Sequence, residues 1–338
     1  MKKIFALSLS FLLLVSCSSK PTEGTEKNTS HTEEPKPREV QLLPDRHFER
    51  GFNALPGNKS FDNGTYPEND YTDSVYLKYT TDGDNPIWQL QQTGAIYDLN
   101  DIYNPITKKY PEKVDGYYRF EGVSNHVYVN TDKGEIKLGL EASKEYEHAR
   151  KDRENWPHLL LQTALTEQLT LADFSSLDFT IDLNLHVENK MNDSEFNSNL
   201  HTAQFLMYFT VNSMNPADSG DYFWFGIPFY DYRNKKASKP VAMLDNGTSG
   251  NTGKVIYQMG TEKIDPDGFR LDHDYQISLN LLDEFQDALL ETQKLGRMTN
   301  TSVQDLSISY MNIGFELPGT FDVEATFSNF SLIATRGA

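Results

Sequence analysis

The chain has 338 residues, and its 31 Lys and Arg against 49 Asp and Glu give it a formal net charge of −18 at pH 7. This charge repels nucleic acids and anionic lipid head groups, so neither is expected as a partner, and polyanionic glycans are disfavoured as ligands. The single cysteine excludes an intramolecular disulfide and a cysteine-based zinc site. Neutral ligands fit this charge balance best.

The N-terminal segment MKKIFALSLSFLLLVSC has the layout of a secretory signal, because two lysines precede an apolar run and then small residues. The run is too short to span a membrane. Leu14–Cys17 resembles the lipobox of bacterial lipoproteins, and this resemblance implies that residues 1–16 are removed and that Cys17 is lipidated, for example with palmitate. Ser18 is similar to the residue at this place in lipoproteins of the outer membrane. We expect a lipid-anchored protein of the cell envelope, in the outer membrane or at the cell surface of a bacterium, with the leaflet left open.

The segment after Cys17 is rich in Ser, Thr, Glu, Lys and Pro and has almost no aliphatic or aromatic side chain. Such a composition buries too little apolar area to offset the entropy lost on ordering. We therefore predict a flexible tether over residues 17–39 and one folded domain over residues 40–338. Residues 45–150 contain many turns, and a separate small domain there is the alternative.

Alternating apolar residues indicate β-strands through most of the folded part. In LDFTIDLNLHVEN, from Leu177, every second residue is apolar, and FDVEATFSNFSLIA near the C-terminus shows the same period. One helix is predicted around Leu282, Phe285 and Leu289, with Asn280 as its cap and Gly296 at its end. The combination favours a mainly β fold, an antiparallel β-sandwich of the jelly-roll type with one inserted or packed α-helix.

The segment YFWFGIPFYDYR, residues 222–233, contains seven aromatic residues in twelve positions. The period of a strand places Phe223, Phe225 and Ile227 on one face, and these purely apolar side chains are expected in the core. Tyr222 and Trp224 fall on the other face. A proline at 228 cannot donate a ladder hydrogen bond, so we expect a bulge or a strand edge there, either of which would exchange the faces of residues 230–233.

The strand before it, TAQFLMYFTVN, places Gln204 and Tyr208 on the polar face. If the two strands form a hairpin, Gln204, Tyr208, Tyr222 and Trp224 lie together, and aromatic rings beside amides suit the apolar face and the hydroxyl groups of a sugar. The alternative is that a loop, the helix or another sheet covers this face. Further rim contacts of the predicted ligand site are Trp156, Asp231 and Arg233.

An enzyme on the same scaffold is a second hypothesis. A glycoside hydrolase needs two carboxylates about 5 Å or roughly 6.5–9.5 Å apart, and Glu316 and Asp231 are the candidate pair. A polysaccharide lyase would use a Tyr or His base beside an Arg, for which Tyr232, Arg233 and His201 are the candidates. Sequence spacing does not fix these distances.

No cofactor is expected, since no phosphate-binding loop, HExxH helix or GxSxG elbow occurs in the sequence. Structural calcium is considered for two oxygen-rich loops, DGDN at 82–85 and DNGTSGNTG at 245–253, although neither has the spacing of an EF-hand. Asp, Asn and Gly are also the usual residues of ordinary turns.

The lipobox, the tether and the C-terminal strand together resemble bacterial surface lipoproteins that carry a carbohydrate-binding jelly roll. The resemblance implies capture of a glycan at the cell surface. Together with the charge balance it leads us to expect a neutral glycan or polysaccharide as the ligand, and we favour a binding protein over an enzyme. A third hypothesis is a structural or adhesion component of the envelope that binds protein partners, for which a flat exposed aromatic patch would be the sign.

Overall fold

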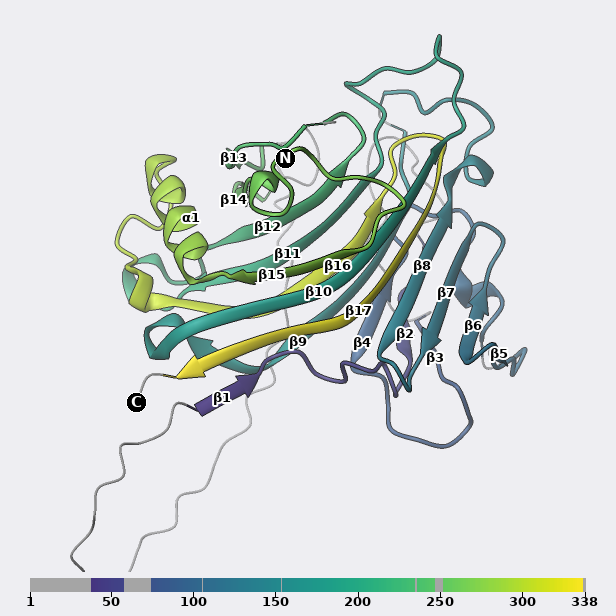
Figure 1. Ribbon diagram of the computed structural model, residues 1–338, viewed down its shortest axis with the longest axis horizontal. Coiled ribbons are helices and arrows are strands. Elements are labelled where there is room, and N and C mark those ends of the chain that lie inside the picture. The colour runs from purple at the N-terminus through teal and green to yellow at the C-terminus, as the bar shows by residue number, and fades with distance from the viewer. Residues whose placement is uncertain are drawn as a thin grey trace, which may run out of the picture.

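A computed structural model of the protein describes residues 38–57, 74–104, 106–152, 154–234, 236–246 and 252–336. The predicted signal peptide, Cys17 and nearly all of the predicted tether lie outside these ranges. The described chain forms a sandwich of two β-sheets with one α-helix (Figure 1), which confirms the predicted fold class. Within these ranges no helix is long and apolar enough to cross a membrane.

Sheet A has eight strands, and β1 pairs with β17 beside the main path. In spatial order the path is β15 (Tyr275–Asn280), β10 (Phe174–Asn189), β17 (Phe321–Arg336), β8 (Glu135–Glu141), β7 (Asn125–Asn130), β6 (Tyr117–Glu121) and β5 (Glu112–Val114). Strand β1 (Arg38–Gln41) begins two residues before the predicted domain boundary, because Arg38 and Glu39 already pair with the end of β17.

Sheet B has nine strands. In spatial order they are β13 (Val241–Leu244), β14 (Val255–Gln258), β12 (Tyr222–Asp231), β11 (Gln204–Ser213), β16 (Leu306–Glu316), β9 (His158–Thr170), β4 (Trp88–Gln91), β2 (Phe52–Ala54) and β3 (Val75–Leu77). Most neighbouring strands pair antiparallel, as predicted, whereas β12 pairs with β14, and β2 with β4, in parallel. The chain crosses to the edge strand β13 before it returns as β14, so β14 runs in the direction of β12.

The region over residues 45–150 contributes to both sheets. Strands β2, β3 and β4 extend sheet B beyond β9, and β5–β8 extend sheet A beyond β17. In Figure 1 these strands continue the sandwich at its right-hand end. They share one hydrophobic core with the later strands, which is the arrangement expected of a single domain.

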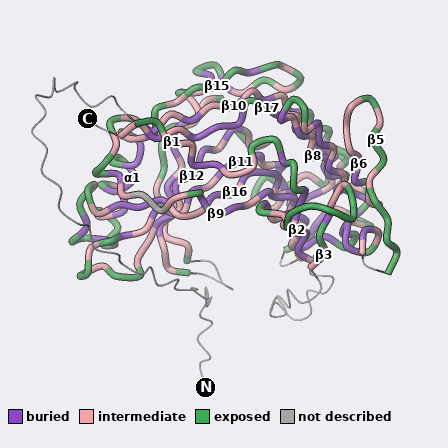
Figure 2. Tube along the Cα trace, turned by 90° about the horizontal axis from the view of Figure 1, so that it is seen from below, coloured by how far each residue is buried: buried purple, intermediate pink, exposed green. Residues whose placement is uncertain are grey.

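The core lies between the two sheets and is built from the apolar residues of each alternating strand. On β10, all residues from Leu177 to Leu185 in the predicted alternating set are buried. Phe205 of sheet B lies 6.3 Å from Phe327 of sheet A between ring centroids, and Phe179 of sheet A lies 6.5 Å from Phe229 of sheet B. Figure 2 shows the two layers, with β15, β10 and β17 in one and β12, β11, β16 and β9 in the other.

Helix α1 (Leu282–Lys294) follows β15 and contacts β12, β13 and β14 of sheet B. The fully buried Phe285 ring lies 4.5 Å from the ring of Phe225 and 6.1 Å from that of Phe209, centroid to centroid. Both partners project from the core side of sheet B. The helix therefore packs against the inner face of β11 and β12, which leaves their outer face free of the helix.

The ends of α1 agree with the prediction at one end and differ at the other. Gly296 has a φ of +75°, the left-handed conformation that commonly ends a helix. The N-cap position is Leu281, whose side chain forms no capping hydrogen bond, so the assignment of Asn280 as the cap was wrong by one residue. Asn280 Oδ1 instead accepts a hydrogen bond from the Leu282 amide, at 3.2 Å, and so still satisfies one free donor of the first turn.

Candidate binding face on sheet B

Strands β11 and β12 form the predicted hairpin, and their register places the predicted platform on the side of sheet B that faces away from sheet A, called the outer face below. Gln204, Tyr208, Tyr222 and Trp224 all lie on this face and are half-buried. The alternating residues between them are buried in the core, as predicted. Neither the helix nor the second sheet covers these four residues.

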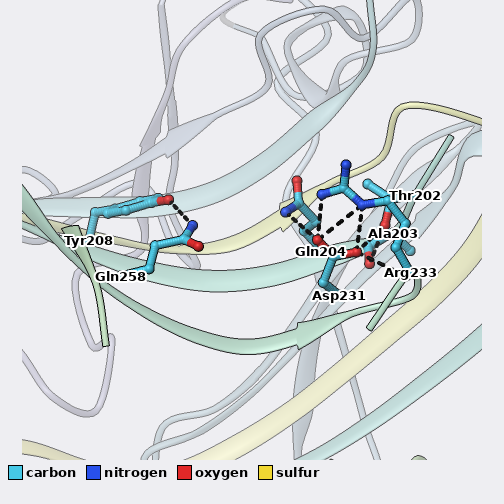
Figure 3. Close-up of polar contacts among 7 residues, drawn as sticks. All are labelled: Thr202, Ala203, Gln204, Tyr208, Asp231, Arg233 and Gln258. Atoms are coloured by element: carbon cyan, nitrogen blue, oxygen red, sulfur yellow. Dashed lines mark hydrogen bonds and ion pairs between the residues drawn. The ribbon is translucent and has the colours of Figure 1, made fainter. Parts of the chain in front are cut away.

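The Tyr208 ring lies over a glycine of the neighbouring strand. A Cβ atom on Gly226 would stand 2.4 Å from Tyr208 Cε1, so only glycine leaves room for the ring. The ring crosses β12 and reaches β14, where Gln258 Nε2 donates a hydrogen bond of 2.7 Å to the Tyr208 hydroxyl (Figure 3). Burial raises the pKa of Tyr208 well above its usual range, so its hydroxyl stays neutral and able to hydrogen-bond in both directions.

A row of amide and tyrosine side chains crosses the outer face at the level of Tyr208. The strand register aligns Gly226 beside Gln258, then Tyr208, Asn312, Gln162, Gln89 and Asn53 on successive strands. We call Gln258, Tyr208, Asn312, Gln162, Gln89 and Asn53 the amide row. Its residues are half-buried and uncharged.

Hydrogen bonds organise part of the amide row and leave two acceptors without a partner. Gln162 Nε2 donates to Gln89 Oε1 at 2.8 Å. The hydroxyl of Tyr310, which lies two residues before Asn312 on β16, donates to the same oxygen at 3.1 Å. The Oδ1 atoms of Asn312 and Asn53 are buried, and neither has a hydrogen-bond partner among the described residues. A buried acceptor without a partner costs free energy unless water or a ligand donates to it.

A second row crosses the same face at the strand ends. It contains Asp231, Gln204, Glu316 and His158, each opposite the next in the register. The register shifts at Pro228, which confirms the predicted bulge. Because of this bulge, Asp231 points to the outer face whereas its neighbours at 230 and 232 pack against the core.

Asp231 is held as a fixed anion. Its carboxylate accepts hydrogen bonds from Thr202 Oγ1 at 2.7 Å, from Gln204 Nε2 at 2.9 Å and from the Arg233 backbone and Nε, both at 2.9 Å (Figure 3). Burial alone would raise the pKa of Asp231, but the bonds from Arg233 and Thr202 outweigh it and hold that pKa below its usual range. Asp231 and Arg233 therefore brace the end of the row, and little of their hydrogen-bonding capacity is left for a ligand.

Glu316 is paired with His158 at the opposite end of the second row. Their side chains lie 3.7 Å apart between Oε2 and Nε2, and His158 Nδ1 donates to the Thr93 carbonyl at 2.9 Å. Burial would raise the pKa of Glu316, but His158 and then the Trp156 side chain lower it below its usual range. Trp156 itself lies under the Arg150 guanidinium, 4.8 Å from the ring centroid, so one of its faces is already occupied.

Asp231 and Glu316, the candidate acid/base pair, lie on one row, but neither has the raised pKa that a general acid needs. Asp231 and Glu316 flank Gln204, so two strand spacings of about 4.8 Å separate their backbones. A glycosidase needs one carboxyl group with a raised pKa to protonate the leaving group. The pKa values of Asp231 and Glu316 are both lowered, chiefly by Arg233 and His158, so neither carboxyl group is held protonated for the acid role.

The three lyase candidates are each engaged in local contacts, since the rings of Tyr232 and His201 both lie near Phe196 and Arg233 pairs with Asp231. Tyr232 lies on the core side, with its ring 4.9 Å from that of Phe321. His201 is buried, accepts from the Asn197 amide at Nδ1 and donates from Nε2 to the Arg150 carbonyl. Both of its nitrogens serve the local loop, so His201 is a structural residue.

Of the two loops considered for calcium, the structure describes all of residues 82–85 but only part of residues 245–253. In the loop at 82–85, Lys78 Nζ contacts the Gly83 carbonyl at 3.0 Å, and Arg50 pairs with Asp84 at 3.1 Å, so basic side chains occupy the oxygens. Part of the loop at 245–253 lies outside the described residues. Among the residues that are described, no group of three or more His, Cys, Asp or Glu side chains could hold a metal ion.

Contacts at the start of β12 cover part of the ring surface of Tyr222 and Trp224, the other two predicted platform residues. Tyr222 and Trp224 meet edge to face, with centroids 5.3 Å apart. Lys254 Nζ lies 4.7 Å from the centroid of Tyr222 and pairs with Asp221 at 2.7 Å. One face of Tyr222 is therefore covered, and of these two residues Trp224 is the better surface for a ring.

The sequence interpretation placed Gly226 on the polar face but missed Gln258, Asn312, Gln162, Gln89 and Asn53 as parts of it. A signal existed for most of them, since they alternate with apolar residues in strand segments such as YMNIGFE and LLLQTAL. Glycine on the polar side of an aromatic strand is also a known sign that an aromatic ring crosses it.

The ion pair of Glu316 and His158 predicts a pH window for stability. Interaction with Glu316 outweighs burial and raises the pKa of His158 from 6.5, while the pKa of Glu316 is lowered from 4.5. The His158 contribution is lost as the pH rises through its raised folded pKa, and the Glu316 contribution is lost as the pH falls through its lowered one. We expect His158→Gln to destabilise most between about pH 4.5 and 6.5, as measured by urea unfolding across pH.

The control is His186→Gln, because the side chain of His186 is 54% exposed in its pair with Asp272 and such pairs contribute little. A stability loss in His158→Gln that is the same at every pH would contradict the assignment.

Comparison with known proteins gives no family. No protein-family model and no curated protein matches the chain. Among solved structures, a cellulase derived from Cel12A of Rhodothermus marinus matches with 12% identity and a TM-score of 0.35, over 62% of this chain and 84% of the cellulase. The family 11 xylanase from Neocallimastix patriciarum matches with 11% identity and a TM-score of 0.35, over 67% and 94% of the two chains.

A third match is the xyloglucanase domain of NopAA from Sinorhizobium fredii, solved in complex with cellobiose. Its identity is 10% and its TM-score 0.32, over 66% of this chain and 94% of that domain. Likeness this distant concerns the sandwich architecture and does not extend to any residue of the outer face.

Proposed function

We propose that the outer face of sheet B binds a neutral glycan chain laid across the strands along the amide row. The observation that carries the proposal is the buried Oδ1 of Asn312, an acceptor without a protein partner in the middle of the row and next to the Tyr208 ring. This oxygen is enclosed in the ligand-free conformation, so a sugar hydroxyl would donate to it once the Asn312 side chain turns toward the face, with the C–H face of the sugar on the neighbouring ring.

The charge and length of the row support a neutral, extended ligand. The protein as a whole is strongly acidic, yet the amide row itself carries no charged side chain. From β14 to β2 the row crosses six spacings between neighbouring strands, or roughly 29 Å at about 4.8 Å each. Amides and hydroxyls that both donate and accept match the hydroxyl groups of several consecutive sugar units.

We further propose that the protein is lipid-anchored through Cys17, on the strength of the residues Leu14–Cys17. Radiolabelled palmitate should then enter the full-length protein in bacterial cells but not its Cys17→Ala variant. Equal labelling of the two would reject the anchor and leave the binding proposal unaffected.

Binding is tested by isothermal titration calorimetry with cellohexaose, xylohexaose and mannohexaose, followed by chromatography of the recovered sugar. We expect one of them to bind and to be recovered unchanged, and Asn312→Ala to weaken that binding about tenfold, the equivalent of about 1.4 kcal/mol, since a hydrogen bond and its acceptor are lost. Asn184→Ala is the matched control, because Asn184 is a half-buried asparagine on the outer face of sheet A.

If Asn312→Ala and wild type bind equally, the row is not the binding site. Cleaved products that disappear in Glu316→Gln would instead support the hydrolase alternative, because Glu316 lies on the same face.

A further inference from the structure

A cavity of about 110 Å³ opens on the outer face at the β14 end of the amide row. Leu206 and Pro228, which lie between the two polar rows, contribute an apolar floor. Gln204 and Gln258 stand on either side of this floor, and the segment that connects β12 to β13 adds Asn234 and Ser238. Gln258 belongs to both the cavity and the amide row, because it also binds Tyr208.

The wall opposite the amide row is held in place by several contacts. The Ser238 amide donates to Thr261 Oγ1 at 2.7 Å. Gly260 packs so closely that a Cβ there would lie 2.8 Å from the Ser238 carbonyl oxygen and 3.0 Å from Pro240 Cδ. At Val241 the segment joins β13, which pairs with β14. A ligand that follows the amide row toward β14 therefore meets a fixed wall.

The size and lining of the cavity match one sugar unit. A single water needs roughly 10–15 Å³ of such space, whereas sites that enclose a drug-sized ligand measure about 300–1,000 Å³. An apolar floor between amide and hydroxyl walls is complementary to a ring with C–H faces and hydroxyl edges. Of the charged side chains that line it, Asp231 pairs with Arg233, Lys239 pairs with Glu262, and Lys236 is exposed to solvent.

We infer that this cavity is a terminal subsite that holds one neutral sugar unit, so that the protein binds a glycan by the end of its chain. The inference rests on the proposed function, since the remainder of the chain would lie along the amide row. An open face would accept the middle of a long chain, whereas Ser238 and Val241 line the far side of this cavity, where the bound chain would end.

The test uses wild-type protein and the three hexasaccharides cellohexaose, xylohexaose and mannohexaose in three forms each: unmodified, reduced to the alditol, and methylated at the 4-hydroxyl of the non-reducing end. For the hexasaccharide that binds, we expect one of the two end modifications to lower the affinity at least tenfold in calorimetry, and the other to change it little. Which modification is harmful identifies the end that enters the cavity.

A pair of variants on one edge strand provides an independent arm. Val241→Trp places a large side chain at the cavity, whereas Met243→Trp makes the same kind of change two residues away, outside the lining; both positions are exposed, at 43% and 45%. We expect Val241→Trp to weaken binding at least tenfold and Met243→Trp to leave it unchanged.

The two proposals fail in distinguishable ways. The terminal subsite is wrong if wild type binds both end-modified hexasaccharides as tightly as the unmodified one, and Val241→Trp binds the unmodified one as tightly as wild type does. If Asn312→Ala still weakens binding in that case, the binding face stands. If wild-type protein binds no hexasaccharide in any form, the proposed function is rejected and this inference with it.

Discussion

Replacing Phe285 with alanine is expected to lower the free energy of unfolding by about 3–5 kcal/mol. Phe285 is fully buried and its ring contacts Phe225 and Phe209, so it holds α1 against the inner face of sheet B. Alanine removes the apolar contacts and leaves a cavity that the surrounding aromatic rings fill only in part. The loss is a large share of the total stability of a typical domain, about 5–15 kcal/mol. Urea denaturation followed by circular dichroism measures it.

The matched control is Leu290→Ala on the same helix, because that side chain is 49% exposed. It should change the free energy of unfolding by at most about 0.5 kcal/mol, as surface substitutions usually do. Equal losses in both variants would mean that the buried face of α1 is assigned wrongly.

Replacing Gly226 with valine is expected to weaken glycan binding tenfold or more, about 1.4 kcal/mol. Valine suits the strand backbone, but its Cβ would lie 2.4 Å from Tyr208 Cε1 and 3.2 Å from Gln258 Cγ. The Tyr208 ring must therefore leave its place, and the hydrogen bond from Gln258 is lost with it. Calorimetry with the hexasaccharide that binds wild type measures the effect.

A double-mutant cycle separates displacement of the ring from a general effect on the strand. In a Tyr208→Ala background the clash no longer exists, so adding Gly226→Val should change the affinity little. Full additivity of the two substitutions would show that Gly226 does not act through Tyr208.

Much of the fold follows from local patterns. The period of two along β10, β11 and β12 identified the strands and the buried side of each, because successive side chains must point to opposite faces. Helical spacing around Phe285 identified α1 in the same way. The parallel pairing of β12 with β14 was missed, since strand direction depends on the path of the chain between the strands.

The candidate site was predicted only in part, for the same reason. Alternation placed Gln204, Tyr208 and Trp224 on one face, and proline chemistry indicated the bulge before Asp231. It did not bring Asn312 beside Tyr208, because that contact joins strands about a hundred residues apart in sequence.

Residue type and neighbours within a few positions are enough to predict the acidic charge, the single cysteine, the strand and helix segments and the polar side of each strand. Contacts between distant segments place the polar residues in shared rows, pair Asp231 and Glu316 with basic partners, and form a cavity at one end of the face. Those features depend on register and on contacts between segments distant in the chain, and a shift of one residue in the pairing would turn every side chain of a strand to the opposite face.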